Sequence, residues 1–150
     1  MQIQGHTINF ADVPVDFTPC FCDECPRSGE CIRHAVGLSV PPKPRIGSSV
    51  YPKSWQGGDC PYFYPIRLIR EAWGFAPLFA KVFTPDAHPL RMKIVNYLGS
   101  ETSYFRYNRG ERTLTPEQQA DILHFFTERG YELSTLRFEH YRETFDFHAG

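Results

Sequence analysis

Residues 20–34 read CFCDECPRSGECIRH, and residues 58–61 read GDCP. Thiolates spaced as in these stretches, with glycine and proline between them, can converge on one centre and bind a soft metal ion. The spacing therefore predicts a metal site that joins two distant parts of the chain. Its candidate ligands are all five cysteines of the 150-residue chain: Cys20, Cys22, Cys25, Cys31 and Cys60.

Five cysteines allow more than one set of four ligands. Cys22 and Cys25 form the closely spaced pair that zinc sites most often use, and Cys31 with Cys60 would complete a tetrahedron. Cys20 can replace Cys22, because its spacing to Cys25 also permits convergence. Zinc is the expected metal, and the choice between Cys20 and Cys22 stays open at this point.

Other interpretations of the same residues also stay open. His34 lies one helical turn after Cys31 and could supply a nitrogen ligand. An iron–sulfur cluster is the alternative to zinc, since proline follows both Cys25 and Cys60, as it often follows cluster ligands. Without a metal, the cysteines would be reduced thiols packed as small apolar groups.

Composition indicates a chain with enough apolar bulk for one core of ordinary size. Hydrophobic residues make up 41% of it and aromatic residues 15%. The formal net charge of −1 predicts no bulk attraction to nucleic acid. Neither a signal peptide nor a run long enough to span a membrane is visible. We therefore expect a cytoplasmic protein without a membrane partner, in a compartment where clustered thiols are more often metal ligands than disulfides.

The N-terminal part, residues 1–61, is rich in turn-forming residues. A short helix is expected near 30–36, ended by Gly37. The connector over residues 38–60 contains several prolines and the Gly-Gly pair at 57–58. A loop of this length is unusual in a compact domain unless something draws it back. We interpret it as the segment that returns the last cysteine to the others.

The remaining part, residues 62–150, is predicted to be mainly helical. Short pieces are expected up to residue 82, then one helix from Thr84 to Gly99 and a second that ends at Gly110. Thr115-Pro-Glu-Gln predicts the start of a third helix through a capping box. The tail is either strand or helix. The expected fold is a small α+β domain spanning the whole chain, with a Cys-rich metal-binding part and a mainly helical part.

Residues 90–128 resemble the helix-turn-helix of small repressors. An apolar helix ends in Leu-Gly, a Ser-capped second helix follows, and Arg-Gly-Glu-Arg precedes another helix. In that family the second helix enters the major groove. The resemblance implies that Arg106, Arg109 and Arg112 lie near nucleic acid. The alternative is a helix pair whose aromatic side chains pack on the core while the arginines are solvated.

Four short motifs are spread over most of the chain. They are Cys-x4-Cys-Pro-x4-Cys at 20–31, Cys-Pro-Tyr at 60–62, Ala-Trp-Gly at 72–74, and Phe-Arg-Tyr-x-Arg-Gly-Glu at 105–111. Together they resemble an uncharacterised bacterial family, a domain of unknown function, in which Tyr takes the place of Phe105. The resemblance implies Cys20 rather than Cys22 as a ligand and carries no known activity.

The sequence favours a protein without enzymatic activity. A nucleophilic cysteine needs a base and an orienting group, and nothing in the sequence places a histidine beside a particular thiol. We therefore expect a metal-stabilised interaction or regulatory protein with structural zinc, whose partner is an unidentified protein or nucleic acid. The alternative is an iron–sulfur or thiol-based redox protein.

Overall fold

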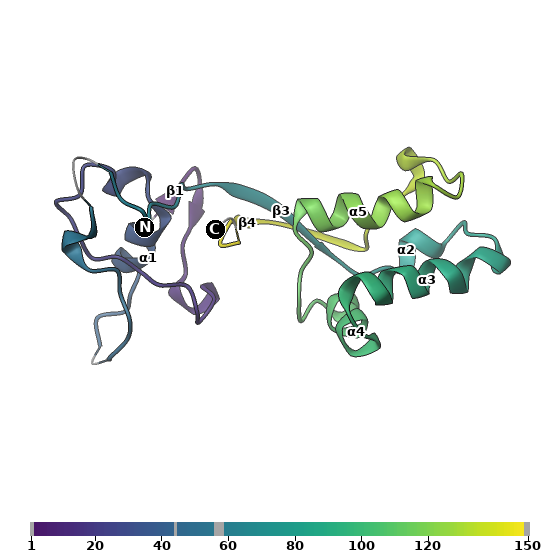
Figure 1. Cartoon of the computed structure of the whole chain (residues 1–150), viewed down its shortest axis with the longest axis horizontal. Helices are drawn as coiled ribbons and strands as arrows, with labels where there is room; N and C mark the ends of the chain where they lie inside the picture. Colours follow the sequence, from purple (N-terminus) through teal and green to yellow (C-terminus); the bar gives the residue numbers. More distant parts are fainter. Residues whose placement is uncertain (1, 44, 56–58, 149–150) are drawn as a thin grey trace. The chain divides into compact units, whose positions relative to one another are not determined.

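The computed structural model describes residues 2–43, 45–55 and 59–148. The chain forms two compact units, one from residues up to 68 together with those from 145 onward, and the other from residues 69–144. The described residues contain five α-helices and two two-stranded sheets (Figure 1). The expected α+β class is therefore confirmed. The Gly-Gly pair of the connector lies outside the described residues.

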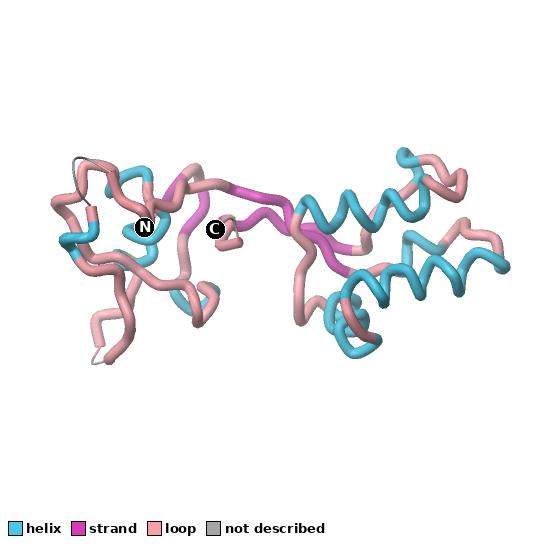
Figure 2. Tube along the Cα trace, viewed as in Figure 1, coloured by secondary structure: helices cyan, strands magenta, loops and turns pink. Residues whose placement is uncertain are grey.

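Most of the first unit is loop (Figure 2). Its short elements are β1 (Gln2–Ile3), β2 (His6–Thr7), η1 (Phe10–Asp12), η2 (Ser28–Glu30), α1 (Ile32–Leu38) and η3 (Pro52–Ser54). Strands β1 and β2 pair in antiparallel fashion. The buried side chains that hold this unit together come from both ends of the chain: Ile8, Cys31, Ile32, Ala35, Val36, Tyr64 and Phe145.

Helix α1 differs from its prediction at both ends. It begins at Ile32, since Glu30 belongs to η2, and Gly37 lies inside the helix instead of ending it. The reason is a close approach of two backbones. A Cβ atom built at Gly37 would collide with the carbonyl oxygen of Cys20. The glycine therefore makes room for the cysteine-bearing segment, and the helix continues to Leu38.

The second unit contains the longer helices. Its elements are β3 (Leu68–Trp73), α2 (Ala76–Phe79), α3 (Thr84–Leu98), α4 (Glu101–Arg109), α5 (Pro116–Thr127), η4 (Leu133–Thr135) and β4 (His140–Phe145), of which the end residues Leu68 and Phe145 belong to the first unit. Strand β4 pairs with β3, so the tail that periodicity left undecided is a strand. Helix α3 packs against both α4 and α5.

Local capping determines where these helices begin and end. Gly99 ends α3 with φ 102°, and Gly110 ends α4 with φ 83°, both in the left-handed region that glycine tolerates. Ser100 caps α4 by accepting the Ser103 N–H at 3.1 Å. The predicted capping box at Thr115 is confirmed. The Gln118 N–H donates to the Thr115 hydroxyl oxygen at 3.3 Å, and the Thr115 N–H donates to Gln118 Oε1 at 3.0 Å.

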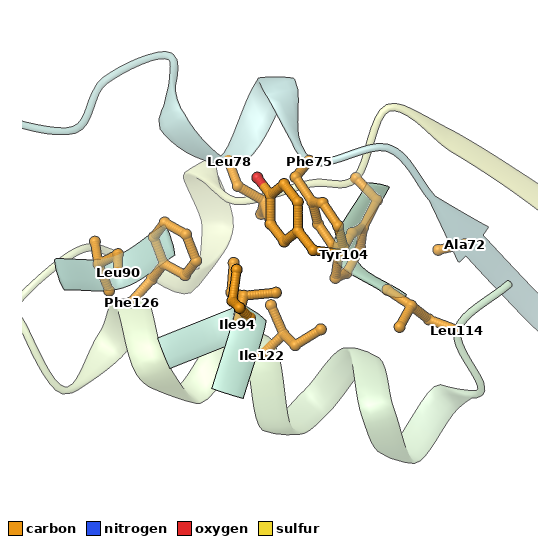
Figure 3. Packing of buried hydrophobic residues seen from close by; sticks show 11 residues of the cluster. Ala72, Phe75, Leu78, Leu90, Ile94, Tyr104, Leu114, Ile122 and Phe126 are labelled. Atoms are coloured by element: carbon orange, nitrogen blue, oxygen red, sulfur yellow. The ribbon is translucent and has the colours of Figure 1, made fainter. Parts of the chain in front are cut away.

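The core of the second unit is built from helices α2 to α5 and strand β3 (Figure 3). Phe75 and Tyr104 stack with ring centroids 4.7 Å apart. Phe79 meets Phe126 edge to face at 5.4 Å. The buried members of this core are Ala72, Phe75, Leu78, Leu90, Ile94, Val95, Tyr104, Leu114, Ile122, Phe126 and Phe138.

Candidate functional site

One cavity of about 30 Å³ in the first unit is lined by every cysteine of the chain. Four of them come from the stretch 20–31, and Cys60 comes from the segment after the connector. Among the described residues, the wall also contains Arg33, His34, Trp55 and Ser54. The structure thus brings the predicted ligand candidates to the wall of a single space, which we call the thiol cavity.

Backbone hydrogen bonds hold the cysteine-bearing stretch between α1 and the connector. The Cys20 N–H donates to the Arg33 carbonyl at 2.9 Å, and Cys20 forms a parallel bridge with Val50. Cys31 forms an antiparallel bridge with Pro65. The N–H of the next residue, Ile32, donates to the Tyr64 carbonyl at 2.8 Å. These contacts link segments far apart in sequence, so tertiary structure positions the first cysteines.

Arg33 forms hydrogen bonds to both of the chain segments that carry the cysteines. Its Nη1 donates to the Thr18 carbonyl at 2.8 Å, and its Nε donates to the Tyr62 carbonyl at 3.0 Å. Thr18 precedes the first cysteine, and Tyr62 follows the last one. The same guanidinium lies 4.8 Å from the centroid of the Phe17 ring. Arg33 thereby places a permanent positive charge in the wall of a cavity lined by thiols.

The sulfur of Cys22 accepts a hydrogen bond, because the indole Nε1–H of Trp55 donates to Cys22 Sγ at 3.3 Å. Burial raises the pKa of the Cys20 thiol above its ordinary value; the backbone N–H of Cys22 opposes the rise, and neighbouring cysteines add to it. A bound cation would reverse this effect by favouring the thiolate.

His34 is the one imidazole in the described wall of the cavity. It is 9% exposed, and its Nε2 lies 2.8 Å from Asp23 Oδ1. A carboxylate on one ring nitrogen orients the ring and selects the tautomer. His34 remains a candidate nitrogen ligand beside the thiols.

The side chains around the cavity do not form a ready metal site in this arrangement. Within the described ranges, no group of three or more His, Cys, Asp and Glu side chains could hold a metal ion as they stand. All five cysteines are free thiols. A cysteine has one side-chain torsion, so rotation about Cα–Cβ can move its sulfur without moving the backbone. Metal binding would need such rotations.

The predicted nucleic-acid residues lie in the second unit, at and after the end of α4. Arg106, Arg109 and Arg112 are all exposed. Arg109 forms an ion pair with Glu111 at 3.2 Å, and the Arg112 N–H donates to the Arg106 carbonyl at 3.2 Å. The three residues are thus held near one another, with one of the charges paired on the surface.

The aromatic residues of α4 divide between core and surface. Tyr104 is buried against Phe75, whereas Phe105 is 40% exposed and Tyr107 is half-buried. The expected helix pair of α3 and α4 is present. The burial of Tyr104 is a packing role, so this ring is not available to a nucleic acid.

Sequence reasoning missed three residues that shape the thiol cavity: Arg33, Gly37 and Trp55. Each acts through a partner 15 or more residues away. Trp55 had one visible signal, since it is the single tryptophan in the sequence of residues 1–61. The other two had none, because an arginine or a glycine on a short helix does not reveal its tertiary partner.

The fold and the site define a mixed α+β protein with a cysteine-lined cavity. A family of unknown function, DUF6078, matches residues 3–147, and the chain belongs to that family. No curated protein and no solved structure matches the chain. Among the described residues, no helix combines the length and apolar character needed to cross a membrane.

Proposed function

We propose that the thiol cavity holds a structural zinc ion and that the chain is a non-enzymatic interaction or regulatory protein. One observation carries the proposal: all five cysteines, from two segments separated by a long connector, line one small cavity. Convergence of this kind is what a four-coordinate thiolate site requires. A zinc ion would also explain why a loop-rich unit folds, because metal binding supplies folding free energy.

Electrostatics support the same proposal. Four thiolates around a divalent cation leave a net negative charge, and a nearby cation lowers the cost of burying it. Arg33 lies in the cavity wall with its guanidinium held by two carbonyls. In the free protein, burial raises the pKa of the Cys20 thiol, so this thiol releases a proton when the metal binds.

A redox function is the second candidate, and the free state of all five cysteines favours it. Two thiols could form a disulfide by giving two electrons and two protons to an oxidised disulfide partner. An iron–sulfur cluster would use the same sulfur atoms as ligands. The three alternatives differ in metal content and colour.

The experiment is metal analysis of the protein purified under anaerobic, reducing conditions. We expect a colourless protein with about one zinc ion per chain. Cys60→Ser should lose this zinc, whereas Ser54→Ala, a change in the same cavity wall, should keep it. A brown protein containing iron would favour the cluster. A colourless protein without stoichiometric metal would contradict both metal functions and leave the thiol-based one.

We further propose nucleic acid as a partner, bound through Arg106, Arg109 and Arg112. The exposure of all three supports this, as does their position at and just after the end of the second helix of a helix pair. Such contacts to phosphates weaken as salt rises, because binding releases counterions.

The five free thiols support a cytoplasmic, reducing location, and we propose a bacterial source.

A gel-shift assay on random duplex DNA at low salt tests this partner. The variant with all three arginines changed to alanine should lose binding. The control changes three other exposed basic residues of the same unit, Lys81, Lys93 and Arg137, and should retain most of it. Negligible binding by the unaltered protein would remove nucleic acid as a partner, and equal binding by all three proteins would remove these arginines as its site.

A further inference from the structure

The second unit has a hollow that shares no wall residue with the thiol cavity and contains none of the three candidate nucleic-acid arginines. One side of it comes from residues 77–82, in and after α2, and the other from residues 131–137, which follow α5. We call it the α2 hollow. Its volume of about 380 Å³ lies at the lower end of the range for small-molecule pockets, about 300–1,000 Å³.

Hydrogen bonds within the chain hold both sides of the α2 hollow in place. On the first side, the Ala80 N–H donates to the Pro77 carbonyl at 3.3 Å. On the second side, the Leu136 N–H donates to the carbonyl three residues earlier at 3.1 Å. The two sides are joined where the Phe83 N–H donates to the Tyr131 hydroxyl oxygen at 3.0 Å. The hollow is therefore preformed, which lowers the cost of binding a ligand there.

Most of the wall of the α2 hollow is apolar. Leu78 is 1% exposed, and the other large apolar members of the wall are partly buried: Pro77, Val82 and Leu136. The two hydroxyls of the wall, on Tyr131 and Thr135, already donate hydrogen bonds to other groups of the protein. What this wall offers a ligand is thus mainly contact with hydrocarbon.

The charges in the wall of the α2 hollow are all positive. Lys81 and Arg137 belong to the wall and are exposed, and no acidic residue belongs to its described part. Neither side chain forms an ion pair or a hydrogen bond with a described residue. Five other basic residues of this unit do pair with a carboxylate: Arg91, Lys93, Arg109, Arg129 and Arg142.

Carboxylates close to the hollow do not neutralise its two cations. Asp86 accepts the Tyr131 hydroxyl at 2.7 Å, but its charge is paired with Arg129 at 2.8 Å. Glu132 lies in the second segment and is not part of the wall. The α2 hollow therefore combines an apolar floor with two positive charges that no described carboxylate pairs with.

We propose that the α2 hollow binds a small organic carboxylate with an apolar body. The body would pack on Leu78 and its apolar neighbours, and the carboxylate would bind to Lys81 and Arg137. A guanidinium can donate two parallel hydrogen bonds to one carboxylate, and an ammonium adds a further charge. Inorganic phosphate would leave the floor unused, and a neutral apolar molecule would leave the cations unused. This inference is independent of the proposed zinc and nucleic-acid functions.

The test is an NMR titration of the full chain with octanoate, monitored at the backbone amides. Two comparison probes separate charge from apolar contact: octanamide, a neutral molecule of the same length, and inorganic phosphate. We expect octanoate to cause saturable shifts at residues 78–82 and 131–137. Octanamide should bind at least about tenfold more weakly, because it lacks the charge-assisted bonds. Phosphate should cause no saturable shift there. This comparison needs no variant.

Variants then assign the two parts of the site. Lys81→Gln combined with Arg137→Gln should weaken octanoate binding about tenfold and leave octanamide binding unchanged. The matched control, Arg70→Gln with Lys93→Gln, removes one arginine and one lysine of the same unit outside the wall and should leave both affinities unchanged. Ala80→Phe adds bulk to the wall at an exposed position and should weaken both probes.

Four results would overturn the proposal. They are the absence of saturable octanoate shifts at these residues, equal affinity for octanoate and octanamide, saturable phosphate binding as tight as that of octanoate, and unchanged octanoate affinity in the double Gln variant of the wall. The second result would indicate apolar contact alone, and the third would indicate charge alone.

Discussion

Gly37 and Arg33 show how single residues on a seven-residue helix shape the thiol cavity. Gly37 lets the backbone of Cys20 approach α1, and Arg33 bonds to carbonyls before the first cysteine and after the last. Neither residue is a candidate ligand. Both act on the backbone that carries the candidate ligands, so their substitution should disturb the thiol cavity without removing a thiol.

At this scale we predict that Gly37→Ala destabilises the protein. Alanine favours helices more than glycine by about 1 kcal/mol, but its Cβ would collide with the Cys20 carbonyl oxygen. Overpacking against backbone typically costs about 1–3 kcal/mol, so we expect the free energy of unfolding to fall. Urea denaturation measures it. Gly29→Ala is the matched control, since a Cβ there meets no atom within 4 Å. Equal stability of the two variants would contradict the close approach.

Helices α3 and α5 are connected at their ends by a polar network around Asp86. Tyr131 donates its hydroxyl hydrogen to Asp86 Oδ2 at 2.7 Å, and Arg129 Nη1 donates to Oδ1 at 2.8 Å. The Tyr131 oxygen accepts the Phe83 N–H at 3.0 Å. The network joins the first turn of α3 to the segment after α5. The pKa of Asp86 lies below its ordinary value of 3.8. The hydrogen bond from Tyr131 is the main cause, and Arg129 adds to it.

This lowered pKa predicts a pH dependence of stability. The ionised carboxylate stabilises the native state above the unfolded pKa of 3.8, and the contribution disappears as pH falls through the lower native pKa. Asp86→Asn does not titrate, so its stability deficit relative to the unaltered protein should shrink as pH falls below 3.8. Urea midpoints above and below this pH measure the difference.

Asp16→Asn, an exposed change in the first unit, is the control for Asp86. It removes one carboxylate as Asp86→Asn does, but leaves the hydrogen bonds of Tyr131 and Arg129 to Asp86 in place. A deficit of Asp86→Asn that stays constant over the acidic range would contradict a stabilising, ionised Asp86.

Across the whole molecule, two units have separate buried clusters of different composition. The described cluster of the second unit contains no cysteine, whereas that of the first unit includes Cys31. The thiol cavity also belongs entirely to the first unit, as far as the described residues show. A metal in this cavity would therefore stabilise one unit directly.

We predict that removing the metal affects amide exchange unevenly. With a chelator present, the amides of the first unit, such as those of Cys20 and Ile32, should exchange faster. Those of α3 and α5 should stay protected, because their core does not depend on the thiols. Hydrogen exchange with mass spectrometry resolves the two groups. Unchanged exchange in the first unit, or equal acceleration in both, would contradict a structural metal there.

The sequence by itself determined the ends of the main helices and the α+β class. Gly99 and Gly110 end helices, and Thr115 begins one, through bonds within a few residues. Such local chemistry is visible without a tertiary partner. The concentration of the cysteines in two stretches was equally visible, and it predicted a shared site.

Only the tertiary structure decided how the cysteine stretch is held and where the tail goes. Phe145 belongs to the core of the first unit, and β4 pairs with a strand about 70 residues earlier, a pairing that periodicity could not reveal. The same holds for the Trp55 bond to Cys22, whose partners lie 33 residues apart in the sequence. These contacts are non-local, and their free energy depends on neighbours that only the folded chain brings together.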